Sequence, residues 1–153
     1  ENEPFEKTNK EFHDGFEEQF RKLALQPFAK ETIIKINEKN AIQSILSATV
    51  QQRLTEQVGF FDLQSYLDNI VGISSTPSGY GKEYEGSELM MAVDIPASET
   101  IIVGDSVLDF SVSQSLGIDC ALVYNGHNDV DRLKATGAYT FEHIGDFYSW
   151  LTD

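Results

Sequence analysis

Residues 100–117 read TIIVGDSVLDFSVSQSLG, and this stretch joins an apolar run to a helical segment through a Gly-Asp turn. The β-branched apolar run at 100–103 predicts a buried strand. Residues 106–116 predict a helix, and Gly117 is placed to end it, because glycine readily adopts the left-handed conformation that terminates many helices. A buried strand that turns directly into a helix is typical of a parallel sheet covered by helices on both faces.

The same alternation of strand and helix patterns extends to both sides of this stretch. Short apolar runs predict further strands, and segments with helical spacing lie between them. We therefore expect an α/β fold with a Rossmann-like, doubly wound parallel sheet. The further strands are expected at residues 41–46, 69–74, 119–124 and 138–141, and the further helices at 29–40, 50–58, 82–93, 130–135 and 146–151.

The N-terminal segment differs from the rest of the chain because it is acidic and rich in phenylalanine. Phe12, Phe16, Phe20 and Leu23 fall on one face of a predicted helix. This apolar stripe either packs against neighbouring helices or forms a lid or a partner surface. The helix-breaking sequence Gln26-Pro27-Phe28 follows the stripe and marks a boundary.

The charge balance and the cysteine content exclude several classes of protein. The chain has 153 residues, with 25 Asp and Glu against 11 Lys and Arg, and its formal net charge is −14. Nucleic-acid and anionic-membrane surfaces need clustered cations, so neither kind of partner is expected. The one cysteine, Cys120, cannot form an internal disulfide and is expected in the core. No apolar run approaches the ~20 residues of a membrane span, and a cytoplasmic protein is expected.

Polar residues follow the first of the predicted strands, at the edge of the sheet where ligands of such folds bind. Ser47-Ala48-Thr49 comes directly after this strand, and Thr49 and Gln52 have the spacing of a helix capping box. A helix that starts beside Ser47 would offer free N–H groups and a hydroxyl to a phosphate. The alternative is that Ser47 and Thr49 only cap the helix.

Two carboxylates follow the strand at 100–103. Asp105 stands at the end of this strand, and Asp109 comes four residues later on the same face of the next helix. They are unfavourable neighbours unless a cation or a lysine lies between them. They suit Mg²⁺, which binds a few carboxylates together with phosphate oxygens and water. The alternative is that Asp105 stabilises the helix N-terminus while Asp109 is solvated.

Lys82 follows a loop that contains glycine and serine, and it opens a predicted helix. A cation is not favoured at a helix N-terminus, so this position predicts an anionic ligand or a carboxylate partner. A surface lysine is the alternative. Other templates fail, because a P-loop that ends at Lys82 would need glycine in place of Thr76 and the chain has no G-x-S-x-G elbow. The histidines lack the spacing of a metal site and are expected at the surface or as caps: His13, His127 and His143.

Three of these features occur in a fixed order along the chain. They are Ser47 after a strand, Lys82 before a helix, and the sequence Gly104-Asp105-x-x-x-Asp109 after another strand. In this order they resemble the second, third and fourth motifs of the haloacid dehalogenase superfamily. The likeness covers residues 27–151, and the sequence YNGHNDVDRLKATGA at 124–138 is most similar to members of the phosphoglycolate-phosphatase type.

The resemblance implies a phosphatase that hydrolyses a small phosphorylated metabolite through an aspartyl-phosphate, with Mg²⁺ as cofactor. By the same match, Ser47 and Ala48 bind the phosphate, and Lys82 both binds it and takes part in catalysis. Asp105 and Asp109 bind Mg²⁺, and Asp109 also supports catalysis. A catalytically inactive module that binds a phospho-ligand or a protein partner is an alternative, and so is a phosphomutase of the same superfamily.

The first motif of the superfamily, a strand that ends in Asp-x-Asp, is missing from this chain. The sequence Asp129-Val130-Asp131 has the pattern but comes too late to be the nucleophile. In the superfamily the first-motif strand lies between the strands that carry Ser47 and Asp105, so a gap is expected there. Residues 1–26 would then be the remnant of a helical cap, and 27–153 a core without its nucleophile strand. An N-terminal segment upstream of residue 1 is the expected partner that completes the sheet, and the chain alone is expected to be inactive.

Overall fold

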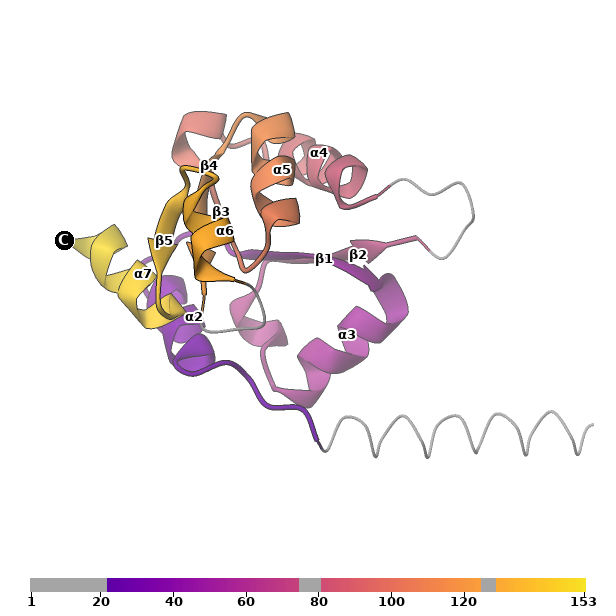
Figure 1. Cartoon of the computed structure of the whole chain (residues 1–153). Coiled ribbons are helices and arrows are strands. Elements are labelled where there is room, and N and C mark those ends of the chain that lie inside the picture. The colour runs from indigo at the N-terminus through magenta and orange to yellow at the C-terminus, as the bar shows by residue number, and fades with distance from the viewer. Residues whose placement is uncertain (1–21, 75–80, 125–128) are drawn as a thin grey trace, which may run out of the picture.

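The computed structural model describes residues 22–74, 81–124 and 129–153, in which helices and strands alternate (Figure 1). The predicted α/β alternation is confirmed. Most of the predicted N-terminal apolar stripe lies outside the described residues, namely Phe12, Phe16 and Phe20. In chain order, the elements are α2 (Ala29–Asn37), β1 (Ser44–Val50), α3 (Gln51–Phe60), β2 (Asn69–Ile73), α4 (Lys82–Val93), β3 (Ile101–Gly104), α5 (Val107–Leu116), β4 (Asp119–Val123), α6 (Val130–Lys134), β5 (Tyr139–Phe141) and α7 (Ile144–Thr152).

The described strands form two parallel sheets. One sheet contains β1 and β2, and the other has the order β3-β4-β5. In the second sheet Ile102 lies opposite Cys120, and Leu122 lies opposite Thr140. Within the part of the chain that the structure describes, β1 pairs with β2 alone and β3 pairs with β4 alone. Each of these two strands therefore has one edge that no described strand covers.

The burial of the second sheet follows from this arrangement. Strand β4 has a neighbour on both sides, and its residues Cys120, Ala121 and Leu122 are 5%, 0% and 0% exposed. The residues of β3 are all only half-buried, although their sequence is as apolar. Parallel sheets are normally buried throughout, so the uncovered edge of β3 is the unusual feature of this fold.

The hydrophobic core is divided in the same way as the sheet. One cluster of buried residues, Leu54, Val58 and Leu63, packs under β1 and β2 and includes part-buried Ile45 and Ile70. The other cluster lies in the three-stranded half and consists of Cys120, Leu122 and Leu133. The expectation that Cys120 lies in the core is confirmed. Each sheet is thus stabilised by its own cluster.

Helix α5 carries clear signals at both ends. Ser106 is its N-cap residue, and Ser106 and Asp109 form a capping box by exchanging side-chain and backbone hydrogen bonds. Gly117 ends the helix in the left-handed conformation at φ 68°, as expected from its place in the sequence. This helix is therefore fixed at the end where Asp105 and Asp109 lie.

The largest difference from the predicted elements concerns β1. The sequence pattern predicts this strand at 41–46, but it spans Ser44–Val50, because Val50 still pairs with Ile73 beyond an irregularity in the ladder. The prediction that Thr49 and Gln52 form a capping box is wrong, because the N-cap residue of α3 is Val50 and no described side chain accepts a hydrogen bond from the free N–H groups of this helix end. Ser47 consequently lies inside the strand, and α3 begins only at Gln51. None of the helices in the described ranges is long and apolar enough to cross a membrane.

Candidate functional site

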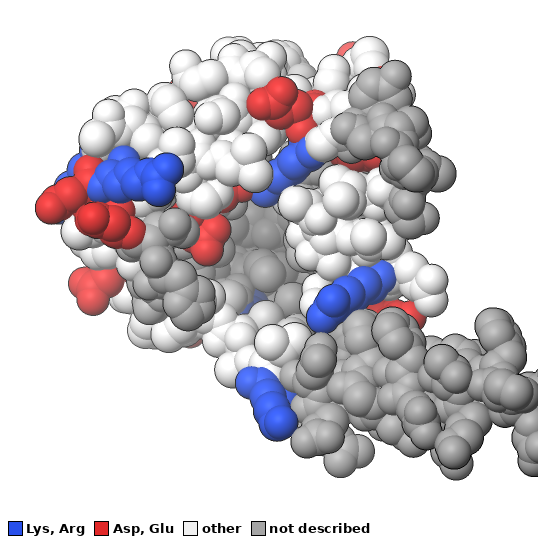
Figure 2. Space-filling view, turned by 45° about the vertical axis from the view of Figure 1, so that its right-hand side comes forward, with Lys and Arg blue, Asp and Glu red and all other residues white. Residues whose placement is uncertain are grey.

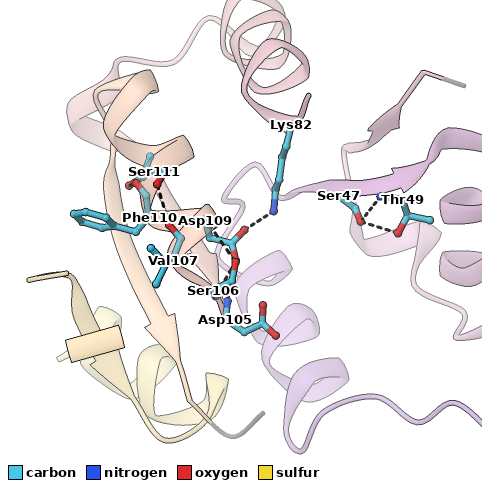
Figure 3. A network of polar contacts seen from close by, with 10 residues as sticks. Ser47, Thr49, Lys82, Asp105, Ser106, Val107, Asp109, Phe110 and Ser111 are labelled. Atoms are coloured by element: carbon cyan, nitrogen blue, oxygen red, sulfur yellow. Dashed lines mark hydrogen bonds and ion pairs between the residues drawn. The ribbon is translucent and has the colours of Figure 1, made fainter. Parts of the chain in front are cut away.

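Lys82 and Asp109 form an ion pair between the first turns of α4 and α5 (Figure 3). Their side chains are 14% and 5% exposed, and the Lys82 Nζ donates a hydrogen bond to Asp109 Oδ1. A lysine at a helix N-terminus is unfavourable on its own, and the carboxylate offsets this cost. The predicted carboxylate partner of Lys82 is confirmed, and the alternative of a solvated Asp109 is wrong.

The other oxygen of Asp109 is held by the turn that follows β3. Asp109 Oδ2 accepts hydrogen bonds from the backbone N–H of Asp105 at 3.0 Å, from the N–H of Ser106 at 3.1 Å and from the Ser106 hydroxyl at 2.7 Å. Burial raises the pKa of the Asp109 carboxyl, but the hydrogen bonds from Lys82 and Ser106 and the charge of Lys82 outweigh burial, so its pKa lies below the ordinary value. Asp109 is therefore an ionised group that fixes Lys82.

Gly104, the last residue of β3, makes this arrangement possible. A Cβ atom at position 104 would lie 2.3 Å from Asp109 Cγ and 2.4 Å from Asp109 Oδ2. The Asp109 side chain thus folds back across the space that any other residue at 104 would fill. A glycine at the end of β3 is therefore required by the close approach of the Asp109 side chain.

Asp105 lies beside the ion pair but is turned differently. Figure 3 shows its carboxylate directed away from α5 and toward the side of the site on which Ser47 lies. Asp105 lines a cavity of about 320 Å³ together with Lys82 and Asp109, a volume at the lower end of the range for small-molecule sites. The remaining lining comes from Gln26, Pro27, Ala29, Val103, Gly104, Val123, His143 and Ile144.

Ser47 and Ala48 lie on β1, across from the other predicted site residues. Ser47 Oγ accepts a hydrogen bond from the N–H of Thr49 at 3.1 Å and donates one to Thr49 Oγ1 at 3.1 Å. Ala48 is exposed. In Figure 3 the Lys82 side chain reaches down between the Ser47 side and the Asp109 side. The structure therefore brings Lys82, Asp105 and Asp109 together at one cavity. Ser47 and Ala48 lie on β1 in the other sheet and are not among the residues that line this cavity.

The space-filling view shows where charged side chains lie on one face of the molecule. Figure 2 shows a hollow in the middle of the face, with both basic and acidic side chains at its rim. The chain as a whole carries a formal charge of −14. The rim therefore carries positive as well as negative side chains, although the chain is acidic overall.

The side chains of the site can be compared with the ligands that Mg²⁺ prefers. Among the described residues, no group of three or more His, Cys, Asp or Glu side chains is arranged to hold a metal ion by itself. Mg²⁺, however, is commonly held by one or two carboxylates together with phosphate oxygens and water. Asp105 has the position for such a ligand at the carboxyl end of β3 and lines the cavity. Asp109 lies beside it, and its two oxygens accept hydrogen bonds from Lys82 and from the turn after β3.

Several residues of the site are not among those predicted from the sequence. Ser106 holds Asp109, and the Ser-x-x-Asp spacing of a capping box is the signal in the sequence that could have found it. His143 lines the cavity and caps α7 by accepting a hydrogen bond from the N–H of Asp146 at 3.2 Å, which agrees with the expected capping role. Asp129 also acts as a cap, because its carboxylate accepts from the N–H of Asp131 at 2.9 Å. The Asp129-Val130-Asp131 sequence thus has a structural role, far from β3 in the chain.

Comparisons with known proteins agree with this fold. Residues 1–123 match the model of the family described as haloacid dehalogenase-like hydrolase. Among curated proteins, a protein of Caldanaerobacter subterraneus named "Putative pyrophosphatase PpaX" is 21% identical over 115 residues, which are 73% of this chain and 50% of that protein. This chain spans half the length of that relative.

Two solved structures illustrate the likeness in fold. A "predicted phosphoglycolate phosphatase" from Haemophilus somnus has a TM-score of 0.80 and 17% identity, and the match covers 100% of this chain and 68% of that one. A "putative beta-phosphoglucomutase" from Thermotoga maritima has a TM-score of 0.79 and 19% identity, with 96% and 69% covered. At these identities the structures show a shared fold.

Proposed function

Because this chain belongs to the family of haloacid dehalogenase-like hydrolases, we propose that it forms most of the active site of a Mg²⁺-dependent phosphatase. The substrate class is a small phosphorylated metabolite. The observation that carries the proposal is the buried Lys82–Asp109 pair with Asp105 beside it at the carboxyl end of β3. This edge of a parallel sheet is where ligands of such folds bind.

The chemistry of phosphate transfer explains why these groups are needed. An attacking carboxylate and a phosphate repel each other, so the reaction requires positive charge that is already in place. Lys82 supplies one such charge, and Asp109 fixes its position through an ion pair that is largely shielded from water. Asp105 would hold Mg²⁺, which when bound supplies further positive charge to the phosphate oxygens. Ser47 would donate its hydroxyl, and Ala48 its backbone N–H, to the same phosphate.

The nucleophile of the proposed reaction comes from a strand between β1 and β3. Two observations support this additional strand. The described strands form two separate sheets, and all residues of β3 are only half-buried. A parallel strand in this space would pair the uncovered backbone groups, which are costly to leave unpaired in a core. An aspartate at its carboxyl end would lie near Lys82 and Asp105 and would form the aspartyl-phosphate. We propose an N-terminal segment of the protein as the source of this strand.

Binding of Mg²⁺ and phosphate is the first expected result. Inorganic phosphate with Mg²⁺ should raise the midpoint temperature of thermal unfolding. A ligand present at 100 times its Kd adds about 2.7 kcal/mol to the free energy of unfolding. For a domain of this size each kcal/mol raises the midpoint by roughly 2–4 °C, so a shift of several degrees is expected. Asp105→Asn should abolish the part of the shift that depends on Mg²⁺. Differential scanning calorimetry of both proteins checks this.

Asp131→Asn provides the matched control, because Asp131 lies on α6 and lines no part of the cavity. This variant should respond to Mg²⁺ and phosphate as the unmodified chain does. If Mg²⁺ raised the thermal midpoint of the Asp105→Asn variant as much as that of the unmodified chain, the proposed metal site would be contradicted. Binding without any phosphate release once the missing strand is supplied would favour an inactive ligand-binding module, and an isomerised sugar phosphate as product would favour a mutase.

A further inference from the structure

The ladder between β1 and β2 is irregular at the residues proposed to bind phosphate. Leu46 lies opposite Val71 and Val50 lies opposite Ile73, so the three residues 47–49 lie opposite the single residue Gly72. Extra residues of this kind leave the ladder and form a bulge, which redirects side chains and is often found beside functional sites. The bulge 47–49 therefore sets where the Ser47 hydroxyl and the Ala48 N–H lie.

Gly72 holds the bulge from the side of β2. Gly72 is buried, and a Cβ atom at this position would lie 2.5 Å from the carbonyl oxygen of Thr49 and 2.8 Å from Gln51 Cα. The backbone that follows Ser47 thus rests directly on Gly72. The contact leaves no room for a side chain at position 72, so a glycine is required there for the two backbones to approach this closely.

The side chain of Gln51 holds the bulge from the other end. Gln51 Oε1 accepts a hydrogen bond from the N–H of Gly72 at 2.7 Å, and Gln51 Nε2 donates one to the carbonyl oxygen of Ile70 at 3.0 Å. These two backbone groups flank Val71, and a residue of a neighbouring parallel strand would pair with them in the same way. The Gln51 amide therefore takes the place of a backbone residue of a neighbouring strand.

A third contact fixes the orientation of this amide. Gln51 Nε2 also donates to the Thr55 hydroxyl at 3.2 Å, and that hydroxyl donates to the carbonyl oxygen of Gln51 at 3.0 Å. The first turn of α3 and strand β2 are thus tied together through one side chain. Gln51 itself is exposed, so its truncation would remove these hydrogen bonds without leaving a cavity in the core.

We infer that Gln51 is a positioning residue for the phosphate-binding bulge 47–49. It fixes the start of α3 on β2, and through the backbone of 48–50 it fixes the Ser47 hydroxyl and the Ala48 N–H. Gln51 itself does not contact the phosphate. The effect on phosphate rests on the proposed function, whereas the effect on the bulge rests on the contacts of Gln51 and Gly72 alone.

Gln51→Ala in the full chain tests this inference, with amide hydrogen exchange and phosphate titration followed by NMR. Losing the hydrogen bonds of the Gln51 amide, of which the one from the Gly72 N–H bears most directly on the bulge, should speed exchange at the Gly72 and Thr49 amides by about tenfold and weaken inorganic phosphate binding by a similar factor. Gln51→Glu retains an acceptor for the Gly72 N–H but loses the donor to Ile70, so its exchange at Gly72 should be intermediate. Its added negative charge should weaken phosphate binding further.

Gln52→Ala is the matched control, because Gln52 is the next residue of the same helix. Among the described residues, its side chain donates one hydrogen bond, from Nε2 to Glu56 Oε1 at 3.2 Å, and none to β2. This variant should leave both measurements unchanged. Unchanged exchange at Gly72 and Thr49 in Gln51→Ala would overturn the inference, and so would faster exchange with undiminished phosphate affinity. If the unmodified chain binds no phosphate while exchange responds as expected, the positioning of the bulge is supported and the proposed function is contradicted.

Discussion

Replacing Gly104 with alanine should destabilise the protein by about 3 kcal/mol or more, the cost of leaving a buried charge without its partner. The new methyl group would overlap the Asp109 carboxyl, which lies 2.3–2.4 Å from the position of a Cβ atom at residue 104. Asp109 would have to leave, and Lys82 and the N–H groups of Asp105 and Ser106 would lose their acceptor. Chemical denaturation in urea measures this loss directly.

Gly81→Ala is the control for the glycine substitution. Gly81 stands next to Lys82 and has a φ of −78°. Apart from its chain neighbours, no heavy atom of the residues that the structure describes lies within 4 Å of the position of an added methyl group. The change should cost less than about 1 kcal/mol, the scale of a helix N-cap effect. If both alanine variants lost the same stability, the contact between Gly104 and Asp109 would not be what constrains residue 104.

The ion pair of Lys82 and Asp109 should give the second large effect. Asp109→Ala is expected to cost about 3–5 kcal/mol, because it leaves a lysine that is only 14% exposed without a counter-charge. Lys82→Met keeps the length of the side chain and removes the charge. The double variant should lose less stability than the sum of the single variants, with a coupling energy of about 1–3 kcal/mol.

The exposed pair of Lys35 and Glu31 on α2 is a matched control for this cycle. Its side chains are 45% and 58% exposed, and surface pairs of this kind contribute little to stability. A cycle at Lys35 and Glu31 should therefore show coupling near the error of the measurement. Equal coupling in the two cycles would show that burial of the Lys82–Asp109 pair has no energetic consequence.

Local patterns in the sequence predict much of this fold. Helix α4 spans Lys82–Val93 as expected, and Gly117 ends α5 in the left-handed conformation. The prediction that Lys82 has an anionic partner follows from the cost of a cation at a helix N-terminus. These features depend on residues close together in the chain, which is why sequence reasoning can reach them.

Features that depend on distant residues cannot be predicted in the same way. The bulge in β1 exists because Val50 pairs with Ile73, and this contact displaces the start of α3 from its predicted place. The spacing of a capping box occurs at both Thr49–Gln52 and Ser106–Asp109, but only the second forms, since β1 continues through Thr49. The closeness of Gly104 to Asp109 likewise emerges only when β3 and α5 are placed together.

Phosphate release by the completed sheet tests the central claim most directly. The chain would be mixed with a synthetic peptide of five Val and Ile residues followed by Asp-x-Asp, and release of phosphate from p-nitrophenyl phosphate would be measured with and without Mg²⁺. We expect release only with the peptide and Mg²⁺ together, and loss of release in Asp105→Asn or when the first Asp of the peptide is replaced by Asn. Saturating binding of the peptide without phosphate release, or release that persists in Asp105→Asn, would contradict the account.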